Sequence, residues 1–180
     1  MSQRICIVHP AGMGDVVLGL PVANALKRDD PGRRITWVAE PTPAALLRHH
    51  PAVDEVVVHR RGSGARGAAR LARAFRGQRF DVALNPQFRS YTALPLVLSR
   101  APLRVGFDRP LGDRGARLLL NRRVTPIPGR HAQENLLQLL EPLGVPAPDP
   151  VEWRITFTEA ERVAQSAFLR EWTDGRSLSS

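Results

Sequence analysis

The sequence predicts an α/β fold in which a Rossmann-like parallel sheet is flanked by helices. Short runs rich in Val and Ile alternate with longer segments of helical periodicity along most of the chain. This alternation is typical of βαβ units with right-handed crossovers. The length of 180 residues suits one domain with a sizeable core. Hydrophobic residues make up 43% and charged residues 24% of the chain, which excludes disorder as the default state.

The elements follow one another in a regular order. The β-rich run 4–9 is the first expected strand, and it leads into a loop with Gly12 and Gly14. Asp15 is expected to be the N-cap of a helix over 16–28. The pattern then repeats, with residues 108–115 as a loop. It predicts strands over 34–39, 54–58, 80–85, 103–107 and 122–125, and helices over 43–49, 64–76, 89–100 and 131–143.

A proline-rich stretch at 144–150 marks a lobe boundary. We therefore expect a lobe over residues 1–150, followed at 151–180 by a linker and the start of a second lobe. Within that tail, residues 152–157 are expected to form one more strand. Thr158 and Glu161 have the spacing of a capping box that opens a helix over 160–172.

Charge is concentrated in one segment. The net charge is +9, and all 26 basic residues except Lys27 are arginines. Residues 59–80 carry seven arginines and no acid, so most of the excess lies there. One interpretation is an arginine-rich proteome and a solvated helix face. The other is an anionic partner, and nucleic acid is disfavoured because only Phe75 and Phe80 accompany the arginines and no binding motif is present.

Several classes of protein are excluded by what the chain lacks. The single Cys6 rules out a disulfide framework and a CxxC metal or redox motif, and it is expected to pack in the core. No uncharged stretch approaches the ~20 residues that a membrane-spanning helix needs. No signal-peptide pattern opens the chain, so a cytoplasmic location is expected.

The loop after the first strand is the first candidate site, because ligands bind at the carboxyl ends of parallel strands. Gly12 and Gly14 allow close backbone approach, and a helix N-terminus favours anions. A GxGxxG dinucleotide motif would need a third glycine at Val17, which argues against a nicotinamide site. Asp15 has two interpretations here, a helix cap or a functional carboxylate.

Residues 12–27, 31–40 and 51–56 resemble the opening of family 9 glycosyltransferases, the ADP-heptose:lipopolysaccharide heptosyltransferases. Segments 80–90, 104–108 and 131–144 continue the resemblance, which spans residues 4–172. The chain departs from the family pattern at Asn85, where the family has an acid, and at Phe88, where it has a glycine.

The resemblance implies the amino-terminal half of a GT-B glycosyltransferase, the half that holds the sugar acceptor. Asp15 stands at the family's position for the base of inverting transfer. No metal or other cofactor is implied, and the donor expected for a whole protein is ADP-heptose or a similar nucleotide sugar, held by a carboxy-terminal lobe that is missing here. The residues expected to bind the acceptor are Gly12, Met13, Gly14, Arg60, Arg61, Gln87, Arg89, Ser90, His131 and Asn135.

Structural roles stay open for several of these residues. His131 and Asn135 lie four apart on one helix face, where a surface or capping role is as reasonable as a cleft role. Gln87, Arg89 and Ser90 follow a strand end, where a plain loop and N-cap is the alternative. Glu40 is expected to belong to a structural loop.

The resemblance also gives the arginine segment a candidate partner. Acceptors of this family are anionic, lipid A/Kdo-like glycolipids at the inner membrane surface, and each arginine near such a surface contributes about 1 kcal/mol. Arg66, Arg70 and Arg73 share a helix face. A cytoplasmic protein with peripheral contact to the inner face of the membrane is therefore expected. The alternatives are an anionic glycolipid-binding or nucleotide-binding Rossmann module without catalysis.

Overall fold

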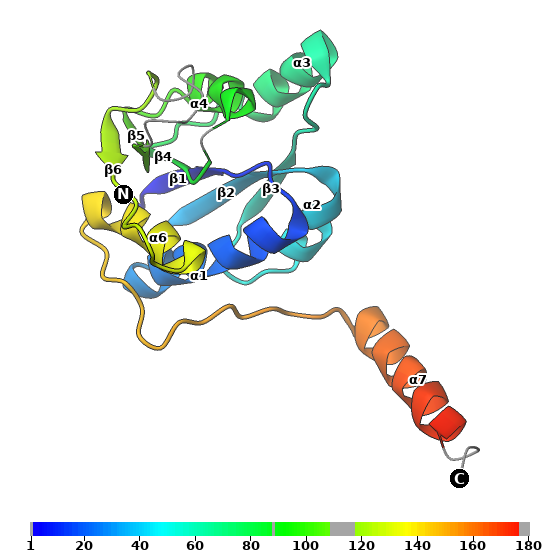
Figure 1. Ribbon diagram of the computed structural model, residues 1–180. Coiled ribbons are helices and arrows are strands. Elements are labelled where there is room, and N and C mark those ends of the chain that lie inside the picture. The colour runs from blue at the N-terminus through cyan, green and yellow to red at the C-terminus, as the bar shows by residue number, and fades with distance from the viewer. Residues whose placement is uncertain (1, 88, 109–117, 177–180) are drawn as a thin grey trace.

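Six parallel strands form the centre of the computed structural model, which describes residues 2–87, 89–108 and 118–176 (Figure 1). Their spatial order is β3-β2-β1-β4-β5-β6, so the direction of winding reverses between β1 and β4. This order confirms the predicted Rossmann-like α/β fold. The strands are β1 (Arg4–Val8), β2 (Arg34–Ala39), β3 (Glu55–Val58), β4 (Val82–Asn85), β5 (Leu103–Phe107) and β6 (Arg122–Val124).

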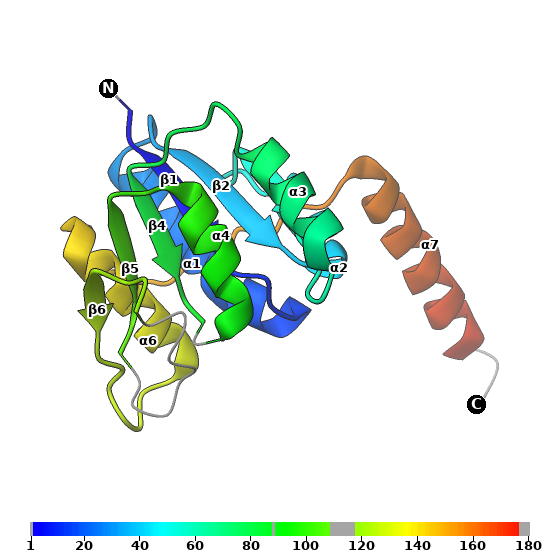
Figure 2. The same ribbon diagram turned by 90° about the horizontal axis from the view of Figure 1, so that it is seen from above.

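Helices cover both faces of the sheet (Figures 1 and 2). On one face lie α1 (Met13–Asp29), α2 (Pro41–Arg48) and α6 (Ala132–Leu137), and on the other lie α3 (Gly64–Ala74) and α4 (Ala93–Ser99). The central strand serves both layers because successive side chains point to opposite faces. Ile5 and Ile7 join the core beneath α1, whereas Cys6 and Val8 join the core beneath α3 and α4.

The expected helix boundaries differ from the observed ones where a tighter turn replaces part of the helix. Residues 89–100 form the short 3-10 helix η1 (Ser90–Thr92) followed by α4, and the last turns of 131–143 form a second 3-10 helix, η2 (Gln138–Leu143). Pro142 lies inside η2, and a proline lacks the N–H that an α-helix would use. The expected loop at 108–115 falls almost wholly outside the described residues.

The N-cap prediction for Asp15 is wrong. Helix α1 begins two residues before it, and Gly12 is the N-cap residue with an extended backbone. Asp15 therefore lies in the first turn, where its carboxylate faces solvent instead of bonding to the backbone N–H groups of the helix end. Asp15 still lies beside the helix N-terminus, but its side chain does not cap the helix.

The strand prediction for residues 152–157 is also wrong. These residues are extended but pair with no strand, and they run past α1 and α2 instead of along a sheet edge (Figure 1). Alternating apolar residues at Trp153, Ile155 and Phe157 produced the strand-like pattern.

Beyond the linker, the capping box at Thr158 is confirmed. The hydroxyl oxygen of Thr158 accepts from the N–H of Glu161 at 3.2 Å, and the carboxylate of Glu161 accepts from the N–H of Thr158 at 2.7 Å. Helix α7 (Glu159–Arg176) follows and stands apart from the body of the molecule in both views (Figures 1 and 2). No helix within the described ranges has the length and apolar character to cross a bilayer.

Candidate functional site

The loops after β1 and β4 meet at the edge of the sheet where the winding reverses, the usual ligand crevice of such a fold. A cavity of about 560 Å³ opens between them. Asp15 comes from the first turn of α1, and the segment that follows β4 contributes several polar side chains. The lining residues are Ala11, Gly12, Asp15, Arg61, Gln87, Arg89, Ser90 and Tyr91.

The loop after β1 is anchored by main-chain bonds. The N–H of His9 donates to the carbonyl of Val38 at 3.1 Å, and the N–H of Ala11 donates to the carbonyl of His9 at 2.8 Å. Gly12 has nothing within 4 Å of the place where a Cβ would stand, so it leaves open space at the cavity wall. The loop thus holds the carboxylate of Asp15 at a fixed point on the rim.

A buried amide shapes the loop after β4. Asn85 is fully buried at the strand end, and its Nδ2 donates to the hydroxyl of Thr92 at 3.0 Å while its Oδ1 accepts from the N–H of Gln87 at 3.2 Å. The Thr92 hydroxyl in turn donates to the carbonyl of Arg89 at 2.7 Å. These three bonds link Asn85, Thr92 and the main chain of the turn into one network, and such a network is rigid. Asn85, the departure from the family pattern, thus organises the loop that carries Gln87 and Arg89.

Arg61 reaches the cavity from the loop after β3. Its Nε donates to Oε1 of Glu40 at 2.8 Å, and its main-chain N–H donates to the same oxygen at 3.0 Å. The hydrogen bond with Glu40 raises the pKa of Arg61. Its guanidinium also stacks 5.2 Å from the ring centre of Tyr91, whose hydroxyl donates to Gln87 at 2.8 Å. Glu40 is a structural residue, as expected, and it orients an arginine of the cavity.

A second cavity of about 230 Å³ adjoins the first and shares Asp15, Gln87 and Arg89 with it. Its walls are mainly apolar, with Leu18, Phe107 and Leu136 among them. Asp15 therefore stands where a polar chamber meets an apolar one. This arrangement suits a ligand that carries both hydroxyl or phosphate groups and a less polar ring face.

His9 lies in the wall of the second cavity, although no sequence pattern marked it as a site residue. It is 2% exposed, and burial lowers its pKa to about 3. Its ring stacks on Trp37 with centroids 5.9 Å apart. A Cβ at Gly19 would stand 3.1 Å from its Nδ1, so the glycine is what lets α1 approach. His9 is a neutral polar group beside Asp15.

The expected site residues divide into two groups. Gly12, Asp15, Arg61, Gln87, Arg89 and Ser90 line the first cavity, and Asn135 lines the second. Four others are exposed and line neither of these cavities, namely Met13, Gly14, Arg60 and His131.

The two residues of α6 have structural partners. His131 is the N-cap residue, and its Nδ1 accepts a long 3.4 Å bond from the N–H of Gln133. The side chain of Asn135 accepts from the N–H of Ile127 at 2.8 Å and donates to the carbonyl of the same residue at 3.3 Å. The amide of Asn135 is therefore committed to holding the preceding loop against the helix.

Metal chemistry has no visible donor set in the part of the chain that the structure describes, where no group of three or more His, Cys, Asp or Glu side chains is placed to hold an ion. Cys6 is fully buried in the first strand, as expected for core packing, and burial raises the pKa of its thiol. The polar side chains of the first cavity are a carboxylate, two arginines and several neutral groups.

A parallel sheet wound in this order, with a cavity at its switch point, defines a Rossmann-like lobe. No family model matches the chain. It is 24% identical over 139 residues to lipopolysaccharide heptosyltransferase 3 of Escherichia coli, a match over 73% of this chain and 40% of that protein.

Solved structures extend the likeness. The family 9 glycosyl transferase of Veillonella parvula superposes with a TM-score of 0.78 at 22% identity, covering 95% of this chain and 50% of that one. E. coli heptosyltransferase WaaC with ADP gives 0.74 at 24% identity, covering 84% and 51%. The chain has the fold of a heptosyltransferase-like family 9 glycosyltransferase over about half the length of these relatives, which confirms the fold that the sequence resemblance implied.

Proposed function

We propose that this chain forms the acceptor half of an inverting glycosyltransferase site that moves a sugar from a nucleotide sugar to an anionic glycolipid. The observation that carries the proposal is the carboxylate of Asp15 on the wall shared by the polar and apolar cavities, opposite Arg61 and Arg89. Two of the relatives named above have heptosyltransferase in their names, and one of these two was solved with ADP.

In this proposal Asp15 is the general base. It takes the proton of the acceptor hydroxyl as the hydroxyl oxygen bonds to the anomeric carbon and the bond from that carbon to the diphosphate breaks. Asp15 is exposed on the cavity rim and carries no helix-capping bond, so both carboxylate oxygens remain available to a substrate hydroxyl. No metal ion is needed for this proton transfer.

The remaining polar groups orient the acceptor. Arg89 and Arg61 supply positive charge for a phosphate or carboxylate of the glycolipid, and charge-assisted bonds of this kind are the strong ones. Gln87 and Ser90 offer neutral donors and acceptors to sugar hydroxyls. The donor, ADP-heptose or a similar nucleotide sugar, would be held by a second lobe, and the reaction would take place at the inner face of the cytoplasmic membrane.

The first test uses the chain itself and a soluble, deacylated Kdo-bearing lipid A acceptor, followed by heteronuclear NMR titration. We expect saturable shifts around Gln87 and Ser90, and an affinity about tenfold lower in Arg89→Gln, because one charge-assisted bond is lost. Arg48→Gln, at an exposed position on α2 that lines neither cavity, is the matched control and should bind normally. ADP-heptose should give no saturable shifts in this cavity, and tight nucleotide binding there would replace the proposal with a nucleotide-binding module.

The second test addresses the base. Asp15→Asn should bind the acceptor as well as the parent chain does. Paired with a donor lobe, it should lose at least about 100-fold in turnover, the usual contribution of a general base. Full turnover of Asp15→Asn would remove Asp15 from the mechanism and leave a binding module without the proposed chemistry.

A further inference from the structure

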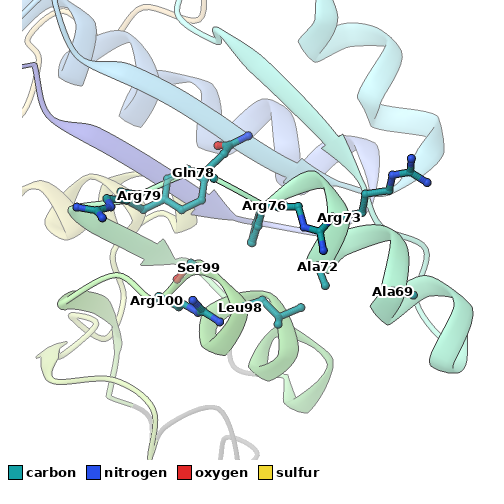
Figure 3. Close-up of a pocket in the computed structure, with 12 residues that line it drawn as sticks. Ala69, Ala72, Arg73, Arg76, Gln78, Arg79, Leu98, Ser99 and Arg100 are labelled. Atoms are coloured by element: carbon teal, nitrogen blue, oxygen red, sulfur yellow. The ribbon is translucent and has the colours of Figure 1, made fainter.

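The arginines that line the hollows of this protein differ in how firmly their side chains are held. A wide hollow of about 1030 Å³ beside the carboxyl ends of α3 and α4 is lined by Arg73, Arg76, Arg79 and Arg100 (Figure 3). None of these four side chains makes an ion pair with a residue that the structure describes. Figure 3 shows Arg73 and Arg79 extending away from each other. These arginines therefore do not converge on one ligand, whereas Arg61 of the first cavity is held in place.

Two neighbours hold the side chain of Arg61. Its Nε donates to Oε1 of Glu40 at 2.8 Å, and its Cζ lies 5.2 Å from the ring centre of Tyr91, within the range of a cation–π contact. Glu40 engages Nε and the main-chain N–H of Arg61, and it leaves the two terminal Nη groups for other partners. The guanidinium is thus fixed by one edge and one face, with its remaining donors at the cavity that Arg61 lines.

The hydroxyl of Tyr91 holds a second side chain of the same cavity. It donates to Oε1 of Gln87 at 2.8 Å. A glutamine amide offers one acceptor oxygen and one NH₂ group with two donors. Because Tyr91 occupies the oxygen, the NH₂ group is the end that remains for a ligand, and it makes no hydrogen bond with any residue that the structure describes. The bond to Tyr91 therefore makes Gln87 a donor at the cavity wall.

Tyr91 is itself well anchored. It is the central residue of η1, and the next residue, Thr92, is fully buried and accepts from Nδ2 of Asn85 at 3.0 Å. The side chain of Tyr91 is half-buried and lines the cavity. One aromatic side chain, projecting from a turn that the Asn85 network fixes, thus contacts both Arg61 and Gln87.

Fixed donors of this kind suit an anionic oxygen group, such as a carboxylate or a phosphate. Such a group accepts several hydrogen bonds at once, and those from a guanidinium are charge-assisted. A side chain that is already ordered adds to affinity, because its freedom is not lost again on binding. Arg89, the other arginine of the cavity, has no such restraint among the described residues.

We propose that Tyr91 is a positioning residue, which holds the guanidinium of Arg61 with its ring and the amide of Gln87 with its hydroxyl so that both donate to one anionic oxygen group of the ligand. The identity of that ligand as a glycolipid acceptor rests on the proposed function. The alignment of the two donors by Tyr91 does not.

The first test separates the two contacts of Tyr91 by NMR titration with the soluble, deacylated Kdo-bearing lipid A acceptor. Tyr91→Phe keeps the ring and removes the bond to Gln87, and it should weaken binding about three- to tenfold, because Gln87 must then be ordered by the ligand. Tyr91→Leu also removes the ring and should weaken binding further, by a similar factor. Val97→Ala, at an exposed position of α4 that lines neither cavity, is the control and should bind like the parent chain.

A double-mutant cycle distinguishes positioning from simple space filling. In a Gln87→Ala background the hydroxyl of Tyr91 has nothing to hold, so Tyr91→Phe should change affinity by less than about twofold. Equal losses with and without Gln87 would show that the hydroxyl acts through the general packing of η1, and full affinity of the single variant Tyr91→Phe would likewise contradict the proposal.

A ligand-free measurement addresses Arg61. Relaxation of its ¹⁵Nε signal should report an ordered side chain in the parent chain and in Tyr91→Phe, and a more mobile one in Tyr91→Leu. Unchanged order in a folded Tyr91→Leu would show that the ring does not hold the guanidinium. If Tyr91→Leu does not fold, as circular dichroism would reveal, the cycle with Tyr91→Phe decides alone.

Inorganic phosphate, used as a second probe in the same cycle, separates this inference from the proposed function. Phosphate binding that depends on Tyr91 and Gln87 together, with no binding of the glycolipid acceptor, would support the positioning role and remove the glycolipid. If neither probe shifts the signals of Arg61 and Gln87, the two side chains do not receive an anionic group and the inference is wrong.

Discussion

His9 has an unusual environment for a histidine. Its Nδ1 and the Nε1 of its stacking partner Trp37 are both buried without a hydrogen-bond partner among the described residues. A small gap lined by both rings and by Gly19 lies between them. Burial of an unpaired imidazole penalises the charged form, which is why the pKa of His9 falls to about 3.

This shift makes the stability of the protein depend on pH in a definite direction. An unfolded histidine has a pKa of about 6.5. Between about pH 6.5 and 3, His9 is therefore protonated in the unfolded chain and neutral in the folded chain. The free energy of unfolding should therefore fall as the pH drops below about 6.5, by about 2 kcal/mol at pH 5 from His9 alone. Burial also lowers the pKa of His50 and His59, which adds in the same direction.

Urea unfolding of the parent chain and of His9→Phe at pH 7 and pH 5 measures the effect. The variant should lose less stability between the two pH values, because a phenyl ring keeps the stacking and cannot bind a proton. His49→Gln, at an exposed histidine, should behave like the parent chain. Identical slopes for parent and His9→Phe would show that folded His9 accepts a proton normally.

The linker over residues 151–158 is an element held by side chains instead of a sheet. Nδ2 of Asn24 donates to the carbonyl of Glu152 at 2.7 Å. Nδ1 of His50 accepts from the N–H of Ala52 at 3.2 Å, so Nε2 carries the proton and donates to the carbonyl of Trp153 at 2.9 Å. These two bonds attach the linker to α1 and to the end of α2.

Asn24→Ala should release the linker. The carbonyl of Glu152 loses its donor, and the free energy of unfolding should fall by about 1–2 kcal/mol. Hydrogen exchange should rise in residues 151–158 more than in the strands, since the linker has few other bonds. Arg28→Ala, at an exposed position near the end of the same helix, is the control. Unchanged exchange in the linker of Asn24→Ala would show that the bond does not hold this segment.

Elements of the sheet could be predicted from the sequence because their pattern is local. Continuous apolar runs predict strands that are buried on both faces, and this prediction needs no knowledge of which strands lie next to them. Examples from such runs are Ile5, Ile7, Ile35, Trp37 and Val38. The linker shows the limit of that reasoning. Its alternating apolar residues look the same as a strand, but whether a sheet edge is within reach depends on the path of the whole chain.

The candidate site was predictable in part for the same reason. The turn that leads into α1 at Gly12 and the segment that follows β4 both come after strands, so their place in the crevice follows from topology. The role of Asn85 depends on Thr92, seven residues away across a turn, and that of Glu40 depends on Arg61. His9 looked like the last residue of a strand, and only the approach of Gly19 and Trp37 reveals its burial. Pairings of this kind are set by packing, which no local pattern encodes.

At the scale of the whole molecule, the body and α7 differ in how they are stabilised. The body encloses two hydrophobic cores, one on each side of the sheet. On α7, by contrast, Val163, Phe168 and Trp172 are 60%, 64% and 51% exposed. A helix with an uncovered apolar stripe contributes little to the fold and presents a surface that favours association.

Two truncations separate the linker from the helix in a single comparison. A chain ending at Thr158 lacks α7 and should keep its free energy of unfolding within about 1 kcal/mol of the parent, because the side chains that the structure describes on α7 are exposed. A chain ending at Pro150 also loses Val151 and Trp153, which pack against the core, and leaves Asn24 and His50 without their carbonyl partners. Its stability should fall by about 2–4 kcal/mol. Urea unfolding of the three chains measures both values, and an equal loss in the two truncations would mean that α7 itself is packed against the body in solution.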